Sequence, residues 1–304
     1  MVTVPLPGVS MVSPYVRRQR LAAELRKLRE ERGMMADELA KRIHYSRMKI
    51  SRLENAHGRP DVADVITILN TLEIPDQKWK EIVTLAHAAA TKGWWDRYGD
   101  AMGARQRLYA DVESGAATIR EYNNTTIPGL LQTAEYSSAL VKLKRAEGAL
   151  GFSPSKMTEA RERRQAVILD PEGPVYDLIL DEVVLRRISV PIEIMAAQLH
   201  LLITRVTSQP QTNVRVLPVD AYMEGVAVPR SAFSLYTFPD PADPPMVIVD
   251  APSHDLAYTE PDDVDQHVKR YELLSEAVLS SEDSLKCLAE AADRLSRRAT
   301  GAGG

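Results

Sequence analysis

The stretch Met35-Ala-Asp-Glu-Leu-Ala-Lys-Arg-Ile-His-Tyr-Ser-Arg-Met-Lys-Ile-Ser-Arg-Leu-Glu54 decides the fold of the N-terminal part of this 304-residue chain. It contains two amphipathic helical segments separated by a short turn. Leu39 and Ala40 lie on the inner side of the first segment, and Ile43 ends it. Ser46 is a favourable N-cap for the second segment, because its hydroxyl can accept a hydrogen bond from a free helical N–H group. The stretch therefore predicts a helix-turn-helix.

The second segment has an inner apolar side and an outer polar side. Ile50 and Leu53 are three residues apart and point inward at about 100° per residue. The residues on or beside the opposite side are Arg47, Met48, Lys49, Ser51 and Arg52. Insertion into the DNA major groove requires such a helix, with one buried face and one basic, hydrogen-bonding face. An ordinary amphipathic hairpin with a solvated basic face is the alternative.

The flanking sequence favours the helix-turn-helix. Residues 20–33 predict a helix that stops at Gly33, a residue suited to the position just past a helix end. Its inner stripe consists of Leu21, Leu25 and Leu28. After the motif, Gly58-Arg59-Pro60 forms a turn, and Asp61 can cap a further helix.

Two short motifs, Arg26-x-Leu-Arg-x-x-x-Gly33 and Ile50-Ser-Arg-Leu-Glu-Asn55, lie in the register of a known family. Over residues 20–79 the chain closely resembles the Xre (Cro/cI-type) DNA-binding domain, a five-helix bundle. The resemblance implies base contacts by Arg47, Met48 and Arg52, with Lys49 and Ser51 as secondary candidates. Arginine suits guanine O6 and N7, and a methionine can press against a thymine methyl group.

Two residues depart from the family pattern. Family members usually carry glutamine where this chain has Ala36, and glycine in the turn where it has His44. Histidine adopts the left-handed conformation at some energetic cost. We therefore expect the fold to survive while operator choice, and to some extent affinity, differ from those of the family.

The charge distribution also favours a polyanionic partner for the first domain. Residues 14–60 contain 13 lysines and arginines against 6 acids, whereas the whole chain has 38 against 42. The rest of the chain is therefore acidic, and the basic part would face DNA. The expected phosphate contacts are Arg17, Arg18, Arg26, Ser46 and Arg59.

Composition limits the other classes of protein. With 44% apolar residues the chain can form two buried domains, and its one cysteine, Cys287, permits no disulfide within it. Cys287 is expected in the core. No apolar run approaches the roughly 20 residues that cross a bilayer, and residues 1–10 lack a basic signal-peptide region. A cytoplasmic location is expected.

The chain after residue 100 predicts a mixed domain. Apolar, β-branched segments at 175–180, 214–217, 233–238 and 246–249 predict strands, and 192–206, 262–279 and 284–298 predict helices. The segment ending near Tyr122 fits either a helix or a strand. The fold class is thus an N-terminal all-α helix-turn-helix bundle followed by a larger α+β domain.

This second region carries Trp94-Trp95 and the core Ile127-Pro-Gly-Leu-Leu-Gln-Thr133. Both motifs are similar to those of the effector domain of actinobacterial Xre-type regulators of the WhiJ-like, antitoxin-like family. Relatives usually have a Tyr-Val-Glu strand where this chain has Ile248-Val249-Asp250, so the acidic residue at this position is Asp250. The resemblance suggests an effector or partner site, for which Trp94, Trp95, Gln132 and Asp250 are the candidates. Packing of the two domains is the alternative role of the tryptophans.

The expected division of the chain is a disordered arm at 1–15, a DNA-binding domain at 16–80 with its motif at 35–54, a helical connector at 81–100, an α+β effector domain at 101–298 and a disordered tail at 299–304. No catalytic constellation, metal site or cofactor motif is found in the sequence. The acidic loop at 250–262 is expected to be a solvated connection.

We therefore expect a sequence-specific transcriptional regulator that binds double-stranded operator DNA. A homodimer is expected on mechanical grounds, because one helix-turn-helix reads only a few base pairs. The resemblance adds a small acidic partner protein encoded nearby. The alternatives are a small-ligand sensor, a domain that serves only for dimerisation, and an antitoxin-like protein whose main role is to sequester its partner.

Overall fold

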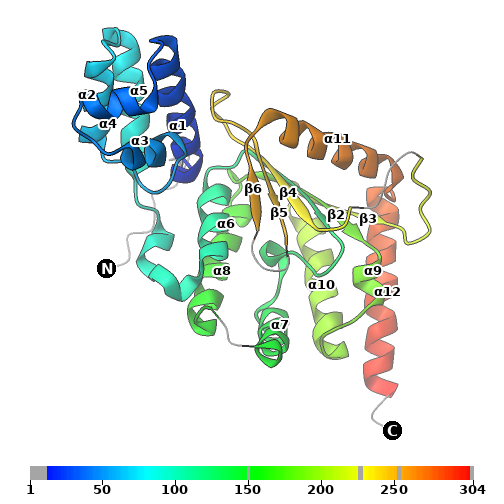
Figure 1. The fold of residues 1–304 in the computed structure, drawn as a ribbon. Coiled ribbons are helices and arrows are strands. Elements are labelled where there is room, and N and C mark those ends of the chain that lie inside the picture. Colours follow the sequence, from blue (N-terminus) through cyan, green and yellow to red (C-terminus); the bar gives the residue numbers. More distant parts are fainter. Residues whose placement is uncertain (1–11, 149–150, 225–228, 252–254, 302–304) are drawn as a thin grey trace.

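The structure is a computed structural model that describes residues 12–148, 151–224, 229–251 and 255–301. Two domains lie in contact, a small helical one and a larger one built around a sheet (Figure 1). The helices of the first domain are α1 (Pro14–Glu31), α2 (Ala36–Arg42), α3 (Arg47–Glu54), α4 (Val62–Thr71) and α5 (Asp76–Ala90). The predicted fold class, a helical bundle followed by an α+β domain, is confirmed.

The helix ends of the first domain follow from the residues that flank them. The Ser13 hydroxyl accepts a hydrogen bond from the N–H of Val16 at the start of α1. Gly33 ends α1 with a φ of 61°, and His44 occupies the turn of the motif with a φ of 54°. Histidine therefore adopts the left-handed conformation here, as the sequence predicts.

The core of the first domain joins all five helices. Its fully buried side chains include Leu25, Leu39, Ile50, Leu69 and Ala86. The same core is tied together by one buried ion pair between α1 and α3. Arg29 donates from Nε and Nη2 to the two carboxylate oxygens of Glu54, at 2.7 and 2.8 Å. A third donor, Nη1, reaches the Met34 carbonyl oxygen at 2.8 Å, so the guanidinium fixes the helix-turn-helix against α1.

The second domain begins with the short 3-10 helix η1 (Trp94–Met102). Its remaining elements, in order, are α6 (Ala104–Ser114), β1 (Thr118–Asn123), η2 (Gly129–Leu131), α7 (Ala134–Glu147), α8 (Pro154–Leu169), β2 (Val175–Asp181), α9 (Val183–Arg186), α10 (Ile192–Ser208), β3 (Thr212–Leu217), β4 (Phe233–Thr237), β5 (Met246–Val249), β6 (Leu256–Tyr258), α11 (Pro261–Ala277) and α12 (Ser281–Gly301).

The sheet has six strands in the order β3-β2-β1-β4-β5-β6. The first three are parallel to one another, and the other three are added in antiparallel fashion. Tyr122 of β1, for example, lies opposite Ile179 of β2 and Phe233 of β4. Parallel strands require crossover connections, and the helices between β1, β2 and β3 supply them.

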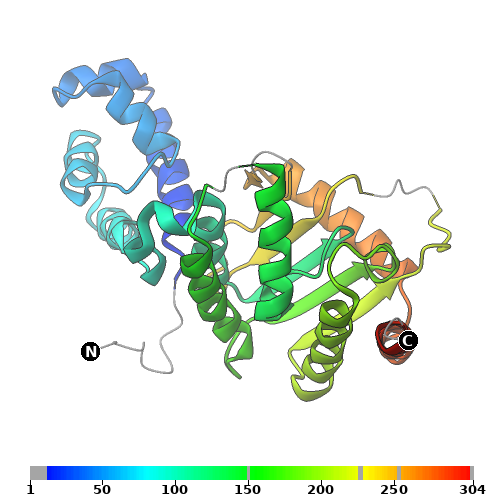
Figure 2. The same ribbon diagram turned by 90° about the horizontal axis from the view of Figure 1, so that it is seen from below.

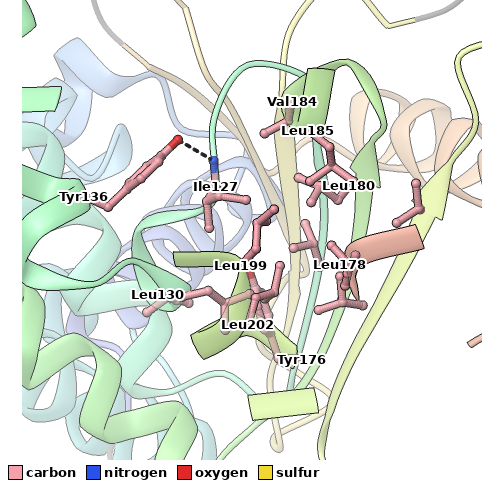
Figure 3. Packing of buried hydrophobic residues seen from close by; sticks show 14 of the residues in the cluster. Ile127, Leu130, Tyr136, Tyr176, Leu178, Leu180, Val184, Leu185, Leu199 and Leu202 are labelled. Atoms are coloured by element: carbon pink, nitrogen blue, oxygen red, sulfur yellow. Dashed lines mark hydrogen bonds between the residues drawn. The ribbon is translucent and has the colours of Figure 1, made fainter. Parts of the chain in front are cut away.

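Both faces of the sheet are covered. Alternating residues of β2, such as Tyr176, Leu178 and Leu180, pack with Leu199 and Leu202 of α10 on one face (Figure 3). The opposite face, which includes Ile179 and Phe233, packs against α11. Figure 2 shows α10 and α12 on the near side of the sheet, with α11 behind it. The sheet is therefore the middle layer of three.

Helix α1 belongs to both domains. Val16 is buried in the core of the second domain, nine residues before Leu25 in the core of the first. Asp111 of α6 accepts hydrogen bonds from the Ser13 hydroxyl at 2.7 Å and from the Tyr15 N–H at 2.9 Å. The second domain thus holds the N-terminal turn of the helix on which the first domain is built.

The structure shifts several predicted boundaries. Helix α1 starts at Pro14, inside the expected disordered arm, and residues 1–11 lie outside the described part. Helix α5 packs into the first core through Ile82 and Leu85, so residues 81–90 are not a connector. Helix α12 runs to Gly301, into the expected tail. The segment ending near Tyr122 is a strand, and β6 has no counterpart in the sequence prediction.

No helix in the described ranges is both long and apolar enough to cross a membrane.

Replacing Glu54 with alanine is expected to lower the free energy of unfolding by about 3–5 kcal/mol, because Arg29 then keeps a buried charge without its carboxylate. Urea unfolding followed by circular dichroism measures the change. The control is Glu38→Ala, which removes an exposed carboxylate paired with Arg42 and should cost less than about 1 kcal/mol. Equal losses in the two variants would contradict a structural role for the buried pair.

Candidate nucleic-acid interface

Helix α3 is fixed at both ends. At its start, the Ser46 hydroxyl accepts a hydrogen bond from the Lys49 N–H, which satisfies one of the free N–H groups of the first turn. Ile50 is fully buried in the middle, and Glu54 forms the ion pair with Arg29 at the end. One face of the helix is therefore anchored, and the orientation of the other is set.

The outer face of α3 is open to solvent. Met48 is 72% exposed, so its apolar side chain is available for contact. Ser51 and Arg52 are exposed beside it, and Asn55 donates to the Ser51 carbonyl oxygen at 2.6 Å. An exposed face of methionine, serine and arginine offers contacts to both a thymine methyl group and base-edge acceptors.

The two flanking cations differ in how firmly they are held. Arg47 pairs with Asp37 at 3.0 Å, and both side chains are more than half exposed, so the pair is weak and exchangeable. Lys49 donates to Asp64 of α4 at 2.6 Å and lies 3.9 Å from the centre of the Tyr45 ring. Hydrogen bonding to Asp64 raises the pKa of Lys49. Lys49 is thus turned toward α4 rather than along the outer face.

Two expected phosphate contacts lie between the domains instead. Arg17 pairs with Asp240 and Asp243, each at 3.0 Å, and Arg18 approaches Asp111 at 3.4 Å. These carboxylates come from the β4–β5 loop and from α6. No local sequence pattern in the first domain indicates that Arg17 and Arg18 pair with them. Both guanidinium groups already have anionic partners, which a DNA phosphate would have to displace.

The other three candidates also have structural partners. Arg26 donates to the Glu54 carbonyl oxygen at 2.6 Å and to the Asn55 side chain at 2.9 Å. Arg59 pairs with Asp96 of η1 at 2.9 Å, and the Ser46 hydroxyl is used in capping. Arg26 therefore contacts the start of the loop after α3, and Arg59, near the end of that loop, contacts η1.

Sequence reasoning missed the residues that hold the bundle together. Arg29 and Glu54 both lie in the quoted motifs, yet nothing local shows that they pair across 25 positions. Arg32 likewise donates to the carbonyl oxygens of Leu72 and Glu73, at 2.7 and 2.9 Å. The available signal was a charged residue, such as Arg29, at a helix position that should be buried.

The effector candidates of the second domain separate into two groups. Gln132 accepts a hydrogen bond from Arg161 at 2.8 Å, and Asp250 pairs with Arg105 at 2.7 Å. The guanidinium groups of Arg105 and Arg164 lie 5.9 and 5.1 Å from the centre of the Tyr109 ring, and Arg161 and Arg164 both approach Gly129. The two candidates therefore contact one cluster of arginines.

The tryptophans belong to a different, apolar cluster. Trp95 is buried with Tyr98 and Met102, and the Trp94 ring meets those of Trp95 and Tyr98 edge to face. The members of this cluster come from η1, α6 and α8, so these contacts are packing within the second domain and not the packing of the two domains that the alternative expects.

The arginine cluster is a buried polar network next to the sheet. Arg164 makes two hydrogen bonds to Glu113, at 2.7 and 2.6 Å. Glu121 of β1 accepts from the Tyr176 hydroxyl at 2.7 Å, and burial raises the pKa of Glu121 to about 7. The segment 250–262, expected to be a solvated connection, is exposed or half-buried over its described length. It nevertheless contains the strand β6 and the Asp255 side chain, which is 3% exposed and lies 2.9 Å from Arg105. Residues 252–254 lie outside the described part.

The helix-turn-helix bundle places the chain in the class of helix-turn-helix DNA-binding proteins, and here the bundle is joined to an α+β domain. The family pattern described as "Helix-turn-helix domain" matches residues 20–80. The pattern described as "Domain of unknown function (DUF5753)" matches residues 106–290, more than half of the chain, so the chain belongs to the DUF5753 family. Comparison with curated proteins and comparison with solved structures each gave no match.

Titration of Glu121 gives the stability a pH dependence. Its carboxyl binds a proton more tightly in the folded chain than in the unfolded chain, so stability should fall as pH rises from about 4.5 to about 7. The slope from this group is at most about 1.4 kcal/mol per pH unit. Glu121→Gln should remove that part of the decline.

Urea unfolding of both proteins at several pH values measures the difference. The free energy of unfolding of Glu121→Gln relative to the unsubstituted chain should rise between pH 5 and pH 7. A difference that stays constant across this range would contradict the raised pKa.

Proposed function

We propose that the chain is a sequence-specific transcriptional regulator that reads its DNA operator with the outer face of α3. The observation that carries the proposal is the exposed set of Met48, Ser51 and Arg52 on a helix whose inner face is anchored by Ile50 and Glu54. A helix held in this way presents base-reading side chains without loss of its own packing.

The proposed base contacts are Arg52 and Met48 first, then Ser51 and Arg47. Arg47 can exchange Asp37 for DNA, because its surface ion pair is weak. Lys49 is a flanking contact, since Asp64 holds its ammonium group. Phosphate contacts fall to Lys41 and Arg42 of α2, which are exposed, and the surface pair of Arg42 with Glu38 is weak enough to exchange. Arg17 and Arg18 are held at the second domain by less exposed carboxylates.

The finer parts of the proposal concern the assembly and the second domain. We propose a cytoplasmic homodimer, because two symmetric copies supply the affinity that one short motif lacks. Resemblance supports membership of the actinobacterial Xre-type, WhiJ-like and antitoxin-like group, and with it a small acidic partner protein for the second domain. A role in binding rather than catalysis is part of the same proposal, as are operation without a cofactor and the alternative of a small-ligand sensor.

The proposal is tested by capture of genomic DNA fragments at about 150 mM salt with the purified chain and an Arg52→Ala/Met48→Ala variant. Each lost base contact should weaken operator binding by about 1–3 kcal/mol, which is roughly 5- to 150-fold per contact. The unsubstituted chain alone should enrich a two-fold symmetric sequence.

The matched control is Lys80→Ala, which removes one exposed cation from α5, a helix that packs mainly on α1 and α4. This variant should recover the same fragments as the unsubstituted chain. Recovery of one diffuse set by all three proteins would contradict sequence-specific reading. Partner binding by the second domain would then be the main function.

A further inference from the structure

A cavity of about 400 Å³ lies beside the sheet of the second domain, and its lining includes none of the residues Arg105, Arg161 and Arg164. It is bounded by Phe233 at the start of β4, Val249 at the end of β5, and His267 and Arg270 of α11. Arg230 and Ser231, just before β4, complete its polar lining. The volume is within the range of small-molecule sites, which is roughly 300–1,000 Å³.

The cavity is lined by cations without acids. Among the described residues the two buried arginines, Arg29 and Arg164, are both paired with carboxylates. At the cavity, Arg270 is half-buried and Arg230 is exposed. In the described part of the chain, neither Arg230 nor Arg270 has a carboxylate within ion-pair distance, and no acidic residue lines the cavity. Two guanidinium groups at one cavity provide forked donors that match a carboxylate or a phosphate.

His267 adds an oriented ring to the same wall. Its Nδ1 lies 2.8 Å from the Asp263 carbonyl oxygen, which can only accept, so Nδ1 carries the proton. The second ring nitrogen, Nε2, is then the one left for another contact. The ring is held edge-on to Phe233 at 5.3 Å and stacked on Tyr258 at 6.1 Å. Its position is therefore fixed by packing.

We propose that this cavity binds a small organic anion with an aromatic body. The charge is recognised by Arg230 and Arg270, and the apolar body lies against Phe233 and Val249. Aromatic side chains with a few placed polar groups are the usual lining of such a site. The ligand class is thus an aromatic carboxylate or an aryl phosphate.

The site would connect to the first domain through one hairpin. Strands β4 and β5 line the cavity at one end, and the loop between them carries Asp240 and Asp243 at the other. These two carboxylates pair with Arg17 and Arg20 of α1. A ligand that moves this hairpin would act on the helix that carries the helix-turn-helix. This regulatory consequence rests on the proposed function, whereas binding itself does not.

Isothermal titration of the full chain with 1-naphthoate and with phenyl phosphate tests the site without DNA. At least one of the two anions should bind. If 1-naphthoate binds, the neutral analogue 1-naphthalenemethanol should bind at least tenfold more weakly. Arg230→Gln/Arg270→Gln should weaken anion binding at least tenfold. Lys269→Gln, which removes an exposed cation from the same helix outside the cavity, should leave it unchanged.

The proposal is overturned if neither anion binds the unsubstituted chain, or if Arg230→Gln/Arg270→Gln binds the anion as tightly as the unsubstituted chain does. Equal weakening by Lys269→Gln would also overturn it, because the effect would then be one of general charge. Circular dichroism of each variant confirms that it is folded. Operator capture by the same variants is measured separately, so failure of the anion site and failure of DNA reading are distinguishable.

Discussion

The packing of one helix into two cores is the constraint on which the rest of the structure depends. Val16 of α1 is buried in the second domain, and Leu25 of the same helix is buried in the first. Continuous backbone hydrogen bonds make those turns one rigid unit. Arg29, one turn further on, fixes α3 through Glu54. The orientation of the DNA-reading face relative to the second domain is therefore set by α1.

Electrostatics divide the cations of the first domain into two sets. Those near the start of α1 are neutralised by Asp111, Asp240 and Asp243 of the second domain. Those on the outer face of α3 are exposed, and only the weak pair with Asp37 engages Arg47. Net charge favours a polyanion as the partner of this domain. The ion pairs with the second domain decide which side of the first domain would approach that polyanion. The acidic second domain thus leaves the α3 face as the available basic surface.

Local sequence was enough to predict the helix-turn-helix of the first domain and most strands of the second, but not that the end of α5 packs into the first core. Periodicity, the Ser46 cap and Gly33 place the helices, because these signals act within a few residues. The roles of Arg17 and Asp255 could not be predicted in this way. Arg17 pairs with Asp240 across 223 positions, and Asp255 is buried by residues of α6. Contacts of this range depend on the assembled fold.

Hydrogen exchange of the α1 amides, compared between the unsubstituted chain and Asp111→Asn, tests the sharing of this helix most directly. The substitution weakens the contacts that Ser13 and Tyr15 make in the second domain. We expect faster exchange that extends along α1 past Leu25, into the part that lies in the first core. Faster exchange confined to residues 13–20, with the remainder of α1 unchanged, would contradict a helix that couples the two domains.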